Sequence, residues 1–112
     1  MIPRLATSVW VSALLRRADA AGIYATVLHK GDAEGGAVIL VQRARDGCTT
    51  AWNRVAQADG PAWAIAAESN AGEANRVDEY LARQTRYDPD LWIVELVGEE
   101  IQRLVAELSQ SR

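Results

Sequence analysis

Four short apolar segments, joined by tight connections that contain glycine, fill the middle of the chain and limit the folds open to it. They are IYATVLH, AVILVQR, TTAWNRVAQ and AWAIAAE, at residues 23–29, 37–43, 49–57 and 62–68. Valine, isoleucine, threonine and aromatic residues recur in them, as is typical of strands. A parallel neighbour needs a crossover of about a dozen or more residues, so connections this short favour antiparallel pairing. The sequence therefore predicts a four-stranded antiparallel meander, with a hairpin turn at the Asp46-Gly47 pair.

Segments with helical periodicity flank these strands. Residues 7–21 predict a first helix, with Thr7 or Ser8 as its cap and Gly22 as its stop. The helical period returns after residue 75, where one face collects Val77, Tyr80, Leu81 and Gln84.

The end of the chain predicts one more strand and one more helix. LWIVELV, at residues 91–97, is strand-like, and its pairing can be parallel or antiparallel. A last helix has Glu99 and Glu100 in its first turn, and its apolar face consists of Ile101, Leu104, Val105 and Leu108. The expected fold is α+β in the order α-β-β-β-β-α-β-α, with helices packed on a single, mostly antiparallel sheet.

Composition fits one domain that spans residues 1–112. Hydrophobic residues make up 49 % of the chain, which is enough for a core without disulfides. The net charge of −3 argues against nucleic acid as a partner. A single cysteine, Cys48, suits a reducing compartment, and no apolar run approaches the roughly 18 residues of a membrane span. We therefore expect a cytoplasmic protein that does not enter a membrane.

The stretch RQTRYDPDLW, at residues 83–92, has both a structural and a functional interpretation. In the structural one, Pro89 ends the preceding helix, and Tyr87 and Trp92 anchor the turn to the core. One aspartate is then held by backbone amides or by an arginine of the last helical turn. In the functional one, a polar cluster at the mouth of the sheet binds a small anion, and the candidate residues are Arg83, Arg86, Asp88, Asp90 and Trp92.

Three segments of the sequence resemble a known family. They are RLATSVWVSALLRRADAAG at residues 4–22, VLHKGDAEGGAVILV at 27–41 and DEYLARQTRYDPDLWIVEL at 78–96. Together they are similar to the small alphaproteobacterial proteins of the family DUF1491, a domain of unknown function. The helical tail after residue 96 departs from that pattern, in which we expect a polar turn. The resemblance supports the element boundaries and implies no activity.

Other residues give weaker indications of chemistry. His29 is the only histidine and Cys48 has no partner in a CxxC motif, so we expect neither a metal nor another cofactor. Trp52 and Trp63 lie on neighbouring predicted strands and could stack. A basic face for single-stranded nucleic acid would need these arginines together: Arg16, Arg17, Arg43, Arg45 and Arg54.

Two function classes follow from these observations. The first is a non-enzymatic cytoplasmic binding domain, whose partner is another protein or a second copy that packs on the C-terminal helix. The alternative is a small-anion or nucleotide-binding domain, with a hydrolase as one form of it, that uses the Arg83, Arg86, Asp88 and Asp90 cluster.

Overall fold

A computed structural model describes residues 6–57, 60–73 and 75–110, and the elements in this part of the chain follow the predicted order α-β-β-β-β-α-β-α. The bounds are α1 (Thr7–Ala20), β1 (Tyr24–His29), β2 (Val38–Arg43), β3 (Thr49–Gln57), β4 (Gly60–Ser69), α2 (Asn75–Tyr87), β5 (Trp92–Val97) and α3 (Ile101–Gln110). The strands form one open, mostly antiparallel sheet, and the helices pack on it. The predicted α+β class is therefore confirmed.

Strand β5 lies inside the sheet, between β1 and β2, so the expected pairing of β1 with β2 is wrong. The strand order is β1-β5-β2-β3-β4, with β5 parallel to β2 and antiparallel to β1. The meander is limited to β2, β3 and β4, so the expectation that it has four strands is wrong. β5 is buried on both faces, whereas β1 alternates between exposed and half-buried residues. A strand that is apolar on both faces belongs between two covered layers, so β5 takes an interior place and β1 an edge.

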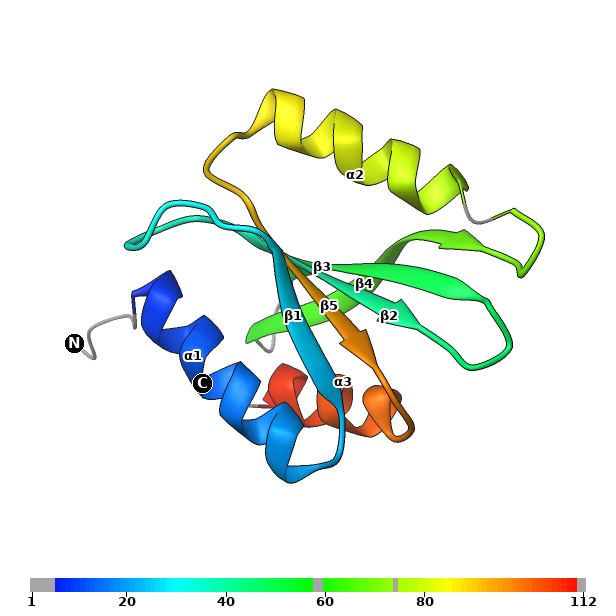
Figure 1. Cartoon of the computed structure of the whole chain (residues 1–112). Helices are drawn as coiled ribbons and strands as arrows, with labels where there is room; N and C mark the ends of the chain where they lie inside the picture. Colours follow the sequence, from blue (N-terminus) through cyan, green and yellow to red (C-terminus); the bar gives the residue numbers. More distant parts are fainter. Residues whose placement is uncertain (1–5, 58–59, 74, 111–112) are drawn as a thin grey trace.

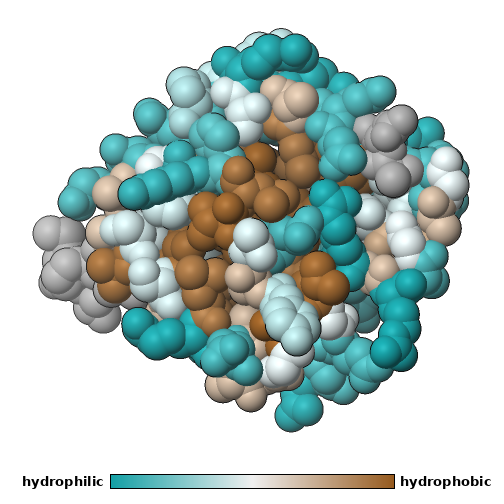
Figure 2. All heavy atoms as spheres, in the orientation of Figure 1, coloured by the Kyte–Doolittle hydropathy of each residue, from teal (hydrophilic) through white to brown (hydrophobic). Residues whose placement is uncertain are grey.

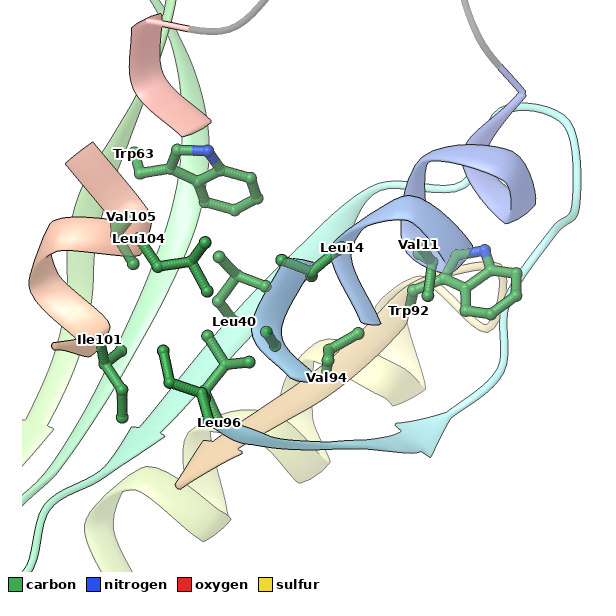
Figure 3. Close-up of a cluster of buried hydrophobic side chains, with 12 residues drawn as sticks. Val11, Leu14, Leu40, Trp63, Trp92, Val94, Leu96, Ile101, Leu104 and Val105 are labelled. Atoms are coloured by element: carbon green, nitrogen blue, oxygen red, sulfur yellow. The ribbon is translucent and has the colours of Figure 1, made fainter. Parts of the chain in front are cut away.

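The sheet separates two helical layers. Figure 1 shows α2 across one face and α1 and α3 on the other. The larger core cluster lies on the α1 and α3 side, and Figure 3 shows its side chains converging from both helices and the strands. Its buried members are Val11, Leu14, Ala18, Ile23, Leu40, Trp63, Trp92, Val94, Leu96, Ile101, Leu104 and Val105. The smaller cluster lies under α2 and contains Ile39, Val41, Ala51, Val77, Leu81, Leu91 and Ile93.

The apolar face of α3 is buried within the chain. Ile101, Leu104 and Val105 belong to the larger cluster, while the burial of Leu108 lies outside what the structure describes. A helix that packs on its own sheet does not offer these side chains to a second copy. Glu99 and Glu100 precede α3, so they do not lie in its first turn as expected.

The loop at residues 30–37, here called the 30–37 loop, wraps the start of β5. The amide of Asp32 donates a hydrogen bond to the carbonyl of Asp90 at 2.9 Å, and the amide of Trp92 donates to the carbonyl of Ala37 at 2.8 Å. The indole Nε1–H of Trp92 donates to the carbonyl of Asp32, also at 2.8 Å. The loop therefore pairs with the β5 entry and does not close a hairpin between β1 and β2.

Two glycines allow this close approach. A Cβ at Gly31 or Gly36 would overlap the carbonyl of Asp90, and one at Gly36 would also meet the Trp92 ring. Gly35, in the same loop, has nothing within 4 Å of the equivalent position. Only Gly31 and Gly36 are therefore needed for the packing of the loop on β5.

The 30–37 loop also caps α1. The amides of Thr7 and Ser8 donate to the carbonyls of Glu34 and Ala33, at 3.1 and 2.9 Å. The N-cap residue is Ala6, without a side-chain hydrogen bond, so the predicted capping by Thr7 or Ser8 is wrong. Backbone carbonyls of a distant segment satisfy amides that a local side chain usually satisfies.

Aromatic residues depart from the sequence prediction in two places. Tyr87 is 86 % exposed, so it does not anchor the turn to the core. The ring that stacks on Trp63 is Trp10 of α1, with centroids 5.7 Å apart, in place of the expected Trp52. Trp52 is half-buried and packs against the same core cluster.

We expect Gly36→Ala to destabilise the fold by about 1–3 kcal/mol, because the added methyl group must displace backbone or the Trp92 ring. Gly35→Ala is the matched control and should change the free energy of unfolding by less than about 0.5 kcal/mol. Urea denaturation of both variants measures the difference. Equal stability of the two variants would contradict the close packing of the loop on β5.

Trp92→Ala should cost roughly 3–5 kcal/mol, because the ring is 5 % exposed and its N–H is paired. Asp90→Asn should stay within about 0.5 kcal/mol of the parent, since the Asp90 side chain is exposed. Urea denaturation, followed by circular dichroism, compares them. A Trp92→Ala variant as stable as the parent would show that Trp92 does not hold the core together.

Candidate functional site

The DPDLW turn, residues 88–92, is held mainly by its own backbone. The carboxylate of Asp88 accepts a hydrogen bond from the amide of Asp90 at 3.1 Å, and the amide of Leu91 donates to the carbonyl of Asp88 at 3.2 Å. The prediction that backbone amides hold one of the two aspartates is thus confirmed for Asp88. Trp92 is buried in the larger core cluster, as predicted. Its indole is therefore a packing group and presents little surface to a ligand.

The five candidate residues do not meet at one place. Arg83 lines a groove between α2 and β4, and neither Arg86 nor the two aspartates are part of that lining. Within the described residues, neither arginine pairs with Asp88 or Asp90. The four charged candidates therefore form no ion pairs with one another within the described residues, and Arg83 alone lines the groove.

The groove, here called the α2–β4 groove, has one wall from each element. Its lining consists of Ile65, Ala66, Ala67, Glu68, Arg76, Tyr80 and Arg83. The helical residues are spaced by four and by three positions, so they share one face of α2. The strand residues include a β-bulge, because Trp52 pairs with Ile65 and Ala51 with Ala67, which leaves Ala66 as an extra residue on β4. The groove therefore follows the bulged stretch of β4, which is an edge strand of the sheet.

The charge of this lining is uneven. Two arginines face one glutamate, which leaves a net positive groove. Arg76 is partly neutralised by Glu73, at 3.6 Å on the same helix. Arg83 forms no ion pair with any residue in the described part of the chain. Arg83 is thus the groove cation that is available to an anionic group.

Sequence reasoning identified Arg83 and missed the rest of this lining. The spacing of Arg76, Tyr80 and Arg83 on one helical face was visible in the sequence. Their position beside residues 65–68 was not, because it depends on how α2 packs against the sheet. The sequence thus showed that these residues share a face of α2, but it did not show which strand that face lies against.

A second polar cluster has a structural role. Nε of Arg43 on β2 donates to Glu95 on β5 at 2.5 Å, and its Nη2 lies 3.3 Å from Asp78 on α2. Hydrogen bonding to Glu95, and then to Asp78, raises the pKa of Arg43. These contacts join α2 to two strands, and both acidic partners of Arg43 belong to the fold itself.

The arginines of the predicted basic face are dispersed. Arg17 on α1 pairs with Glu107 on α3 at 2.9 Å, on one side of the sheet. Arg43 pairs with α2, on the other side, and Arg45 lies 3.7 Å from Glu99. Arg17 and Arg43 therefore pair with acidic residues on opposite sides of the sheet and do not belong to one phosphate-binding surface.

His29 and Cys48 lie at opposite ends of the sheet. His29 pairs in register with Ile93, at the start of β5, and its Nδ1 lies 2.6 Å from the carbonyl of Leu91. Cys48 is in the hairpin after β2, where hydrogen bonding to Asp46 raises the pKa of the thiol. A raised pKa reduces the thiolate fraction, so this environment does not activate a nucleophile.

Residues 6–57, 60–73 and 75–110 contain neither a metal-binding cluster nor a membrane-spanning helix. No group of three or more histidine, cysteine, aspartate or glutamate side chains is placed to hold a metal ion there. None of the helices in this part of the chain combines the length and apolar character that crossing a membrane requires.

Comparisons with known proteins agree on one family. A family model described as a protein of unknown function (DUF1491) matches residues 5–106, which includes the first turns of α3. The resemblance therefore extends past residue 96, where the sequence suggested a departure. No curated protein matches the chain.

Solved structures are similar to this chain in both sequence and fold. The crystal structure of a DUF1491 family protein from Caulobacter crescentus is 37 % identical, with a TM-score of 0.76 over 85 % of this chain and 89 % of that one. The solution structure of protein Atu0922 from A. tumefaciens is 34 % identical, with a TM-score of 0.76 over 92 % and 93 %. An NMR structure of a Caulobacter crescentus family member is 38 % identical, with a TM-score of 0.71 over 82 % and 84 %.

Proposed function

Since this chain belongs to DUF1491, a family of unknown function, we propose its function from its own geometry. It is a non-enzymatic cytoplasmic binding domain, and the α2–β4 groove is its ligand site. The ligand carries an anionic group that pairs with Arg83. No membrane and no nucleic acid is needed as a partner in this proposal.

One observation carries the proposal: Arg83 lines the groove and forms no ion pair within the described residues. A guanidinium is always charged and presents donors that match a carboxylate or phosphate in a bidentate arrangement. Beside it, Ile65 is 51 % exposed and supplies apolar surface in the same groove. A cation beside exposed apolar surface favours a ligand that has both an acidic and an apolar part.

The cluster of Arg83, Arg86, Asp88 and Asp90 receives less support as a nucleotide or hydrolase site. Of these four residues, Arg83 alone lines the groove. The Asp88 carboxylate accepts a hydrogen bond from the Asp90 amide within the turn, which gives it a structural role. The acidic pair therefore has no geometry that would hold a substrate against Arg83.

Titration of the chain with small anionic ligands tests the proposed site. Glutarate, inorganic phosphate and ATP are added to the 15N-labelled chain, and we expect saturable shifts of the amides of Ala66, Ala67 and Arg83 with at least one of them. Arg83→Gln should weaken binding by about tenfold or more, because a hydrogen bond to a charged group contributes about 1.5–3 kcal/mol.

Arg86→Gln is the matched control, since it removes the same charge from the same helix outside the groove lining. It should leave the titration nearly unchanged. Shifts scattered over the surface, or equal losses in the two variants, would refute the site.

Self-association is a second candidate, and it now rests on β1. Tyr24 is 79 % exposed and Leu28 47 % on this edge strand, and Val97, which pairs with Tyr24, is 38 % exposed. Figure 2 shows hydrophobic side chains gathered in the middle of the face that carries β1 in Figure 1. Antiparallel pairing of two copies about Thr26 would set Tyr24 against Leu28 of the second copy, so the strand is self-complementary.

Size-exclusion chromatography with light scattering tests this candidate at high micromolar concentration. We expect a dimer that Leu28→Lys dissociates, because a lysine on an edge strand opposes strand pairing. Val9→Lys places the same change on α1, at a residue that is 51 % exposed, and should leave the dimer intact. A parent chain that stays monomeric would exclude self-association.

A further inference from the structure

We infer that the ligand of the α2–β4 groove is an extended peptide segment with an acidic side chain, which binds as an added strand beside β4. This inference rests on the proposed function and specifies the ligand of the same site. It assigns the backbone of β4 as one half of the recognition and Arg83 as the other.

The first support is the position of β4 at the edge of the sheet. The strand order places β3 on one side of β4 and no strand on the other within the described residues. An edge strand presents amide and carbonyl groups that can pair with another chain. Residues 65–68 all line the groove, so this stretch of the edge strand borders it.

The second support is the matched length of the two walls. Residues 65–68 of β4 extend over about 10 Å, at about 3.3 Å per residue. Arg76 to Arg83 on α2 covers a similar distance of about 10 Å, at about 1.5 Å per residue. A groove of this length, open along a strand edge, accommodates about four residues of extended chain. A ligand helix would fit this edge less well, because its backbone groups are already paired within the helix.

The third support is the position of the charges along the groove. The connection between β4 and α2 is short, so Glu68 and Arg76 lie at the end of the groove nearest this connection, and Ile65 and Arg83 lie farther along. Glu68 and Glu73 offset the charge of Arg76. Arg83 therefore selects the acidic residue, and neighbouring side chains of the peptide meet Ile65 and the alanines.

Alternation gives the expected ligand a recognisable pattern. Successive side chains of an extended peptide point to opposite sides, so the residues on either side of the acid point away from α2. β-Branched residues at those positions favour the extended conformation. The probe that follows is the capped peptide Ac-Ala-Val-Glu-Val-Thr-NH2, with Ac-Ala-Val-Gln-Val-Thr-NH2 as its uncharged partner.

Binding of these peptides is measured by amide shifts and by calorimetry. The glutamate peptide should bind at the groove, and its glutamine partner should bind about tenfold or more weakly. Arg83→Gln should remove that preference, whereas Arg86→Gln should keep it. A preference that survives Arg83→Gln would overturn the pairing of Arg83 with the acid.

Backbone methylation tests strand addition without altering the protein. One peptide carries N-methyl groups at its second and fourth residues, and the other carries them at its third and fifth. Alternate amides of a strand point to the same edge, so only one of the two peptides should lose binding. Equal binding or equal loss would overturn strand addition.

Different results would contradict the groove site and the peptide ligand. Glutarate binding at the groove, together with equal effects of the two methylation patterns, would keep the site and overturn the peptide ligand. If glutarate, phosphate, ATP and the peptides all leave the groove amides unshifted, both the site and the peptide ligand are wrong.

Discussion

The buried indole of Trp92, whose N–H donates to the carbonyl of Asp32, links the segments on which the fold depends. An indole N–H that is taken out of water needs a partner, because leaving it unpaired costs free energy. The 30–37 loop supplies that partner, and other carbonyls of the same loop accept the first amides of α1. The loop therefore positions the first helix and the entry of β5 together. Gly31 and Gly36 are the residues whose missing side chains allow it.

Once β5 lies between β1 and β2, the arrangement of the α2–β4 groove follows. The central position of β5 gives α2 an apolar surface of Ile39, Ile93 and Val41, on which Val77 and Leu81 pack. Arg43, with Glu95 and Asp78, adds polar contacts across the same interface. These pairs are partly exposed, so burial under α2 contributes most of the stabilisation. The face of α2 that looks toward β4 is left beside an open strand edge.

The proposed binding function relies on a groove whose walls are fixed by the fold. The helix and the strand that form the α2–β4 groove are both held by buried contacts, so the groove is formed without a ligand. Preformed walls reduce the ordering cost of binding. Other polar side chains bind partners within the fold. Arg43 pairs with Glu95, and the Asp88 carboxylate accepts a hydrogen bond from the Asp90 amide. Arg83 differs because its charge faces the groove without an ionic partner in the described residues.

The sequence by itself determined the local elements and the faces they bury. Periodicity identified all the helices and strands of the described residues, and Trp92 lies in the core as predicted. Gly22 ends α1 with a φ of 76°, and Gly47 forms the predicted turn with a φ of 92°. These features depend on near neighbours in the chain, which a sequence pattern records directly.

Only the tertiary structure decided the insertion of β5, the capping of α1 by a distant loop and the placement of Arg83 beside β4. A pattern shows that a face must be buried, but several partners can bury it equally well. The choice among them depends on packing and hydrogen bonds between residues far apart in sequence, such as Asp32 and Trp92.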